Sequence, residues 1–278
     1  MGRPHRIDTE RTWYHVMNRG AARQPTFHSD RDCVEFERLL GVGLHRFGIE
    51  VHAYCLMTNH FHLLVHCPQG GLSAHMHQLR SVFTRHLNER AGRDGPLFRG
   101  RFHAIPVKTA DYRLQAARYI HRNPLDIDPA QPLDRYRWSS HRVYLGRRRT
   151  PGWMRTDVIL ESFGGDAAAF DQFVSGCDDR SELGREGRAL HPNELGPIVD
   201  LVIDEFSDPN VLARQGLART VSLLLVDQIH GIDDPRLASD LGYDSDRAFK
   251  EAVWRARRRA AVHPAVSALA NRAARLVA

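Results

Sequence analysis

The chain has 278 residues, of which 42% are hydrophobic and 8% are aromatic. This composition excludes a disordered or fibrous protein, and no apolar run approaches the roughly 20 residues of a membrane-spanning helix. No apolar signal stretch follows the N-terminal Met-Gly-Arg-Pro-His-Arg, so we expect a cytoplasmic protein. Four cysteines without a Cys-x-x-Cys pair are expected to be reduced packing residues: Cys33, Cys55, Cys67 and Cys177.

The net charge of +6 hides three blocks of alternating sign. Residues 1–150 carry +11, residues 151–246 carry −12, and residues 247–278 carry +7. Lys108 and Lys250 are the only lysines, so nearly all of the positive charge is guanidinium, whose planar fork suits phosphate. The charge pattern therefore favours a nucleic acid partner over a membrane.

Residues 1–146 predict alternating strands and helices. In chain order these are a strand over Trp13–Met17, a helix from Ser29 or Asp30 to Gly48, strands over Ile49–Met57 and His60–Cys67 joined by a hairpin, a helix over Leu72–Leu87, a strand over Leu97–Val107, and a helix over Thr109–Asn123 that Pro124 ends. The pattern is typical of an α+β domain with a largely antiparallel sheet and helices on one side.

The composition changes after Gly146. Residues 147–216 predict an acidic connector with a short helix near Ala167–Phe173, and residues 217–278 predict an all-α module. In that module a helix ends at Gly231, a short helix starts at Asp234-Pro235, and a basic helix follows Ser245. This order is expected of a helix-turn-helix, although a plain helical bundle with an arginine-rich surface has the same pattern.

Two histidines, His60 and His62, lie on one predicted strand. Strand side chains alternate, so both imidazoles point to one accessible sheet face and can chelate a divalent ion. The same spacing recurs at His75 and His77, but on a predicted helix, where the two side chains diverge. Geometry alone also allows His60 and His62 to be half-exposed strand residues without a ligand.

Tyr119 and Asn123 are four residues apart and therefore share one helix face. A tyrosine there could attack a phosphodiester, and the Asn123 amide oxygen could complete a hard-cation site with the two imidazoles. Tyr112 lies one heptad earlier on nearly the same side and is the competing nucleophile. By itself, either tyrosine could simply be a packing residue.

Five segments, taken in order, resemble single-tyrosine HUH transposases of the REP-associated type. They are WYHVMNRG from Trp13, YCLMTNHFHLLV from Tyr54, LFRGRF from Leu97, YIHRNP from Tyr119 and YRWSSH from Tyr136. The resemblance covers about residues 5–146 and implies a ferredoxin-like sheet. It also implies that His60 and His62 are metal ligands, Tyr119 the nucleophile and Asn123 a further ligand, although Asn123 could instead cap its helix.

A metal-dependent enzyme that nicks and rejoins single-stranded or hairpin DNA is the function that follows. Mg²⁺ or Mn²⁺ would be the cofactor, and palindromic repeats are a possible target. The residues expected to bind DNA are Arg99 and Arg101 on one strand face, Lys108, and Arg247, Lys250 and Arg255 on the last basic helix. When bound to DNA the protein would be associated with the nucleoid, as a monomer or a homodimer.

Three other functions remain open. One is a non-catalytic DNA-binding regulator derived from such an enzyme. Another is an HUH relaxase or replication-type nuclease. The third is a metallohydrolase that activates water, which the lack of a third strong ligand beside the histidine pair disfavours.

Overall fold

The computed structural model describes residues 9–176, 199, 214–230, 237–238, 241 and 243–277. The chain divides into two compact units, Met1–Asp179 and Arg180–Ala278. None of the helices in the described part of the chain is long and apolar enough to cross a membrane.

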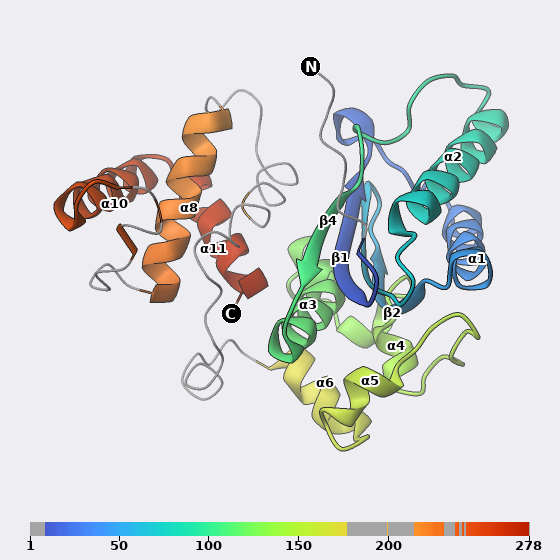
Figure 1. Ribbon diagram of the computed structural model, residues 1–278. Helices are drawn as coiled ribbons and strands as arrows, with labels where there is room; N and C mark the ends of the chain where they lie inside the picture. Colours follow the sequence, from blue (N-terminus) through green and yellow to red (C-terminus); the bar gives the residue numbers. More distant parts are fainter. Residues whose placement is uncertain are drawn as a thin grey trace. The chain divides into compact units, whose positions relative to one another are not determined.

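The first unit is built on a four-stranded sheet with the strand order β2-β3-β1-β4 (Figure 1). The strands are β1 (Thr12–Arg19), β2 (Glu50–Leu56), β3 (His60–Cys67) and β4 (His103–Val107), and all neighbouring pairs are antiparallel. Helix α1 (Asp30–Phe47) connects β1 to β2, and α2 (Leu72–Ala91) connects β3 to β4. This is the split βαβ order of ferredoxin-like folds, as the sequence motifs imply.

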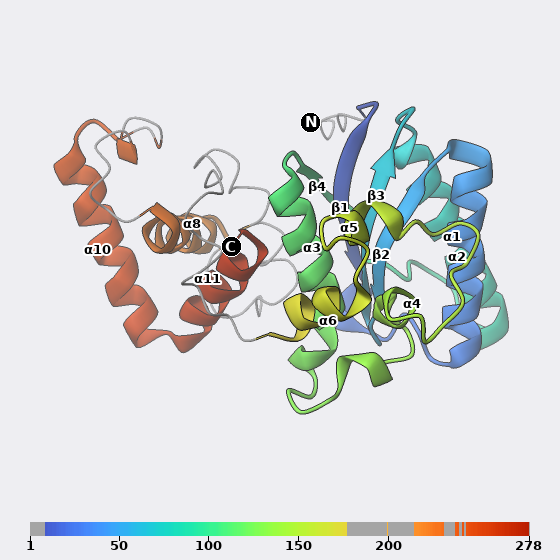
Figure 2. The same ribbon diagram turned by 90° about the horizontal axis from the view of Figure 1, so that it is seen from below.

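Helices cover both faces of the sheet. Helices α1 and α2 lie on one face, and α3 (Ala110–Arg122) lies on the other (Figures 1 and 2). The expectation of helices on one side is therefore wrong. The physical reason is that both faces are apolar: Phe61 and Leu63 are buried against α1 and α2, while Leu64 on the opposite face is equally buried.

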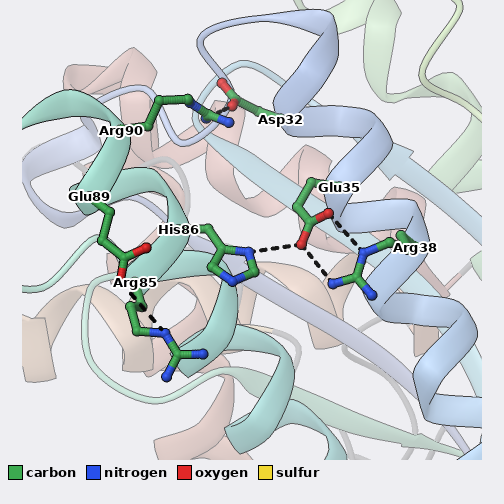
Figure 3. A network of polar contacts seen from close by, with 7 residues as sticks. All are labelled: Asp32, Glu35, Arg38, Arg85, His86, Glu89 and Arg90. Carbon is green, nitrogen blue, oxygen red and sulfur yellow. Dashed lines mark hydrogen bonds and ion pairs between the residues drawn. The ribbon is translucent and has the colours of Figure 1, made fainter.

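Local signals in the sequence set the ends of α1. Ser29 and Asp32 form a reciprocal capping box at its start, and Gly48 ends it with a left-handed backbone, φ 66°. Polar contacts then join α1 to α2 (Figure 3). There Glu35 accepts hydrogen bonds from Arg38 and from His86, and Arg90 pairs with Asp32.

The open edge of β2 is covered by the segment that contains the YRWSSH motif. Ser140 Oγ accepts a hydrogen bond from the Tyr54 backbone N–H at 2.8 Å, and the Trp138 carbonyl accepts one from Leu56 at 2.9 Å. The Tyr136 hydroxyl donates to the Leu56 carbonyl at 2.8 Å. These bonds satisfy an edge that would otherwise offer unpaired backbone groups to other chains. The 3₁₀ helix η3 (Leu133–Arg135) and helix α4 (His141–Tyr144) flank this segment.

Residues 147–176 pack on the first unit, past the boundary that the sequence predicts at 146. Arg148 donates to both oxygens of Glu37, at 2.6 and 2.7 Å, and to the Tyr54 hydroxyl. Met154 forms a bridge with Val51 on β2. Helices α5 (Asp157–Glu161) and α6 (Ala167–Ser175) follow, and α6 corresponds to the expected short helix.

The second unit contains helices α8 (Arg214–His230), α10 (Asp246–Val262) and α11 (Pro264–Val277), which pack on one another. Ser245 caps α10 as predicted, and the expected buried stripe is present: Phe249, Ala252, Val253 and Ala256. Gly231 and the start of the short helix at Asp234-Pro235 lie outside the described residues. Leu237 and Ala238 are helical and buried, as a helix at that position requires.

Candidate active site

His60 and His62 project from β3 toward α3, with ring centroids 5.2 Å apart. His60 is half-buried, whereas the side chain of His62 is fully buried. The expectation that both face an accessible sheet surface is therefore wrong for His62, because α3 covers this face.

His15 on β1 holds the ring of His62. Its Nε2 lies 3.0 Å from His62 Nδ1, and both side chains are buried. Burial lowers the pKa of His62 to about 3 and holds the pKa of His15 well below its ordinary value. Both rings are therefore neutral near pH 7, and His62 has Nε2 as the nitrogen that can act as a ligand.

His60 has an amide oxygen close to each ring nitrogen. Nδ1 lies 2.8 Å from Asn59 Oδ1, and Nε2 lies 3.2 Å from Asn123 Oδ1. The Asn123 amide nitrogen donates to the Tyr119 carbonyl, which directs Oδ1 toward His60. A neutral imidazole carries one N–H and can donate to only one of these oxygens.

This arrangement fits a divalent cation. Two ligand atoms that bind Mg²⁺ at about 2.1 Å at a right angle lie about 3 Å apart, which is close to the separation of His60 Nε2 and Asn123 Oδ1. Asn123 is also the C-cap residue of α3 and the first residue of the 3₁₀ helix η2 (Asn123–Asp126). Both expected roles of Asn123 are thus geometrically available to it.

Tyr119 lies over the same group of side chains. Its ring centroid is 5.4 Å from that of His62 and 5.7 Å from that of His15, both edge-on. Tyr119 is half-buried, whereas Tyr112, the competing candidate, is 6% exposed. Tyr119 is therefore the tyrosine of α3 that contacts the histidine group.

Three residues near the pair carry chemistry that the sequence interpretation did not assign. The first is His15. It lies on the same face of β1 as Met17, which pairs with His62, and the alternation of β1 could have indicated this position. Arg19 pairs with His60 in the register of β1 and β3 and is 5% exposed. Asp126 in η2 is the third, because its charge acts on the pKa of His62 in the opposite direction to burial.

Three further histidines lie away from this group: His75, His77 and His121. His75 is buried and His77 is exposed, so the helical pair diverges as expected. His121 faces Ser140, 2.7 Å away, and the ring of His141. It therefore points off the Tyr119 face.

Arg99 and Arg101 are exposed, but they lie on a loop. The predicted strand from Leu97 begins only at His103, because Gly100 has a left-handed backbone, φ 63°, that interrupts the strand. The Arg99 N–H donates to the Arg19 carbonyl, so the loop adjoins the end of β1 beside His60. Lys108 is exposed after β4.

A pocket next to this loop is lined mostly by polar and basic side chains of α2 and the segment that follows it. Its lining includes Arg80, Arg85, Asn88, Arg93 and Phe98. Phe98 also bridges to Gly20, so the pocket adjoins the end of the sheet at which His60 lies.

The predicted DNA-binding residues of α10 are exposed and lie near acidic side chains of the same helix. Arg247 and Arg255 approach Glu251 at 3.2 and 4.0 Å, and Lys250 approaches Asp246 at 3.1 Å. Exposed pairs of this kind contribute about 0.3–0.5 kcal/mol. A phosphate could compete with such weak ion pairs for these cations.

Comparison with known proteins finds similarity within the first unit. No curated protein matches the chain. A solved structure described as the REP-associated tyrosine transposase bound to a REP hairpin is similar at 16% identity, over 57% of this chain and 93% of that chain, with a TM-score of 0.45. Residues 8–123 match the family model of IS200-like transposases. This segment, which includes His15, His60, His62, Tyr119 and Asn123, is therefore similar to IS200-like transposases.

Proposed function

We propose that the protein nicks and rejoins single-stranded or hairpin DNA through a covalent bond between Tyr119 and a 5′-phosphate. The observation that carries the proposal is the convergence of Tyr119 with His62 and His15, from three separate elements, beside the contact of His60 with Asn123. The family match over residues 8–123 supports a DNA-processing enzyme.

His60, His62 and Asn123 would hold a divalent ion, Mg²⁺ or Mn²⁺. When bound, the ion would polarise the scissile phosphate and offset the charge that develops on it. Asn123 would provide an oxygen ligand, which Mg²⁺ and Mn²⁺ prefer. The chain thus offers two imidazoles and a hard oxygen donor within one site.

The phenolic oxygen of Tyr119 would attack the phosphorus and form the new P–O bond. The bond from phosphorus to the 3′ oxygen breaks, and the leaving strand takes up a proton as its 3′-OH. An unperturbed phenol has a pKa of about 10, so Tyr119 has to lose its proton during attack. The phosphotyrosine conserves the energy of the broken bond, so the strand can be rejoined without ATP.

The DNA strand would approach past the arginine-rich end of the sheet. Arg99 and Arg101 extend from the loop beside the end of β1, and Arg80, Arg85 and Arg93 line the adjoining pocket. Guanidinium groups bind phosphate oxygens in a bidentate manner. We assign the positioning of phosphates at this end to these arginines, whereas Lys108, which follows the opposite end of β4, would contact DNA farther from the site.

The second unit would add DNA affinity through Arg247, Lys250 and Arg255 of α10. Each phosphate contact from such a side chain releases counterions and makes binding sensitive to salt. The predicted helix-turn-helix remains part of this proposal.

The test is adduct formation with labelled oligonucleotides from the flanks of the protein's own gene, as single strands and hairpins. With Mg²⁺ or Mn²⁺, the wild-type protein should form a denaturation-resistant adduct that carries the label 3′ of the nick, together with a free 3′-OH fragment. Tyr119→Phe removes only the phenolic oxygen, so it should bind DNA without forming the adduct.

Tyr112→Phe is the matched control and should form the adduct at the wild-type level. Loss of the adduct in Tyr112→Phe alone would move the nucleophile to that residue. Cleavage without an adduct in any variant would instead favour a metallohydrolase, and binding without cleavage would favour a non-catalytic regulator.

A further inference from the structure

A second group of potential metal ligands lies at the far end of β3 from His60. Glu50, His52 and His66 each offer one ligand atom, and all of these atoms lie within 4.8 Å of one another. Glu50 Oε2 is 2.9 Å from His66 Nδ1 and 3.9 Å from His52 Nε2. The carboxylate is thus positioned between two imidazoles.

The strand register brings these three side chains together. Glu50 on β2 pairs directly with His66 on β3, so both side chains are on one sheet face. The register then shifts between Val51 and Ala53, and His52 between them has no counterpart on β3. Such an irregularity re-aims a side chain and is frequent beside functional sites. Here it places His52 with Glu50.

His52 is a buried imidazole whose ring nitrogens are both unsatisfied. Its side chain is 1% exposed, and neither ring nitrogen has a hydrogen-bond partner among the residues that the structure describes. Buried polar atoms are normally satisfied, so an imidazole with two unsatisfied nitrogens requires an explanation. Glu50 and His66 are 30% and 22% exposed, which leaves a path from solvent to the group.

The surroundings hold both imidazoles in place. The Trp13 ring stacks on His66, with centroids 4.9 Å apart, and contacts His52 at 4.1 Å. Arg113 lies over Trp13, and both Arg113 and Arg155 act on the charge state of His52. With these two cations nearby and one carboxylate in the group, we expect moderate rather than very tight metal affinity.

We propose that Glu50, His52 and His66 form a binding site for a transition-metal ion of the Zn²⁺ class. Two imidazoles and one carboxylate are a known Zn²⁺ ligand set that leaves the fourth position to water. Mg²⁺ prefers oxygen ligands and would bind poorly here. The site is separate from the one at His60 and His62, because His66 is four residues, or about 13 Å of strand, beyond His62.

The ion would connect β2 to β3 directly. A ligand that binds only the folded protein stabilises it in proportion to its affinity and concentration. Zn²⁺ should therefore raise the melting temperature of the first unit, independently of DNA and of nicking.

The experiment uses the full chain after removal of metal with a chelator. We would titrate it with Zn²⁺ by calorimetry and with Co²⁺ by visible absorption, which reports the ligand geometry. Four forms are compared: wild type, Glu50→Gln/His66→Gln, His60→Gln/His62→Gln, and the surface control His77→Gln/His45→Gln. Circular dichroism checks that each form is folded.

Zn²⁺ binding and the Co²⁺ spectrum of this site should persist in the His60/His62 and surface variants. In Glu50→Gln/His66→Gln the affinity for Zn²⁺ and for Co²⁺ should fall by more than about tenfold. Zn²⁺ should no longer raise the melting temperature of this variant. Unchanged binding in that variant, or loss only in the His60/His62 variant, would overturn the proposal. If Glu50→Gln/His66→Gln fails to fold, the single variant Glu50→Gln, which keeps a hydrogen-bonding side chain beside His66, decides by the same criteria.

Discussion

His15 illustrates how one buried contact can tune a candidate metal ligand. His15 Nε2 contacts His62 Nδ1 at 3.0 Å. The other ring nitrogen of His15, Nδ1, has no hydrogen-bond partner among the described residues. A ligand histidine whose second nitrogen is held keeps one tautomer and one ring orientation. We therefore regard His15 as a positioning residue for the proposed active site.

His15→Phe should keep the ring packing against Tyr119 and remove the bond to His62. We expect the Mn²⁺ concentration needed for half-maximal nicking to rise about 10–100-fold, with partial recovery of activity at high Mn²⁺. Metal titration of the nicking rate is the measurement, and His77→Phe on the exposed side of α2 is the control. An unchanged metal dependence would reduce His15 to a packing residue.

At the scale of elements, the contact between α1 and α2 depends on a glycine. Gly43 faces the buried ring of His75, and a Cβ atom at this position would lie 2.3 Å from His75 Cε1. The two helices therefore approach each other where only a hydrogen can be accommodated. This contact also explains why His75, unlike His77, is a core residue.

Gly43→Ala should lower the free energy of unfolding by about 1–2 kcal/mol, because overpacking outweighs the roughly 1 kcal/mol that alanine gains in a helix. Urea denaturation measures this change. Gly152→Ala, where a Cβ would meet nothing within 4 Å, is the control. In the double variant Gly43→Ala/His75→Ala the alanine should no longer be destabilising, since the ring is absent. If the effects of the two substitutions on the free energy of unfolding simply add, the clash with His75 is not the cause of the destabilisation.

At the scale of the whole molecule, residues 147–176 belong physically to the first unit. Arg148 neutralises Glu37, whose side chain is 9% exposed, and Met154 and Phe170 are almost fully buried. A fragment that ends at Gly146 would leave a buried carboxylate unpaired and an apolar surface uncovered. Without Arg148, the Tyr54 hydroxyl would be the remaining hydrogen-bond donor to Glu37 shown in the structure.

We therefore expect a fragment of residues 1–179 to unfold cooperatively and to nick DNA. Its binding should be weaker and less sensitive to salt than that of the full chain, because α10 is missing. A fragment of residues 1–146 should be far less stable. Tryptophan fluorescence in urea measures both fragments, since Trp13 and Trp138 are common to them. Equal stability of the two fragments would place the boundary at 146 after all.

Features that depend on local periodicity and on turn residues can be predicted from the order of the amino acids alone. The alternation of β3 put His60 and His62 on one side, helical spacing put Tyr119 and Asn123 together, and Ser245 marked the start of α10. These features need only neighbours along the chain, so the pattern of residue types is sufficient to predict them.

What lies opposite each side chain depended on how the elements pack. This packing placed α3 over the histidine face and so buried His62, it brought His15 to His62, and it gathered Glu50, His52 and His66 across two strands. These contacts depend on strand register, on a one-residue irregularity, and on which helix covers which face. Such features are set by packing between segments far apart in the chain, and no local period of the sequence encodes them.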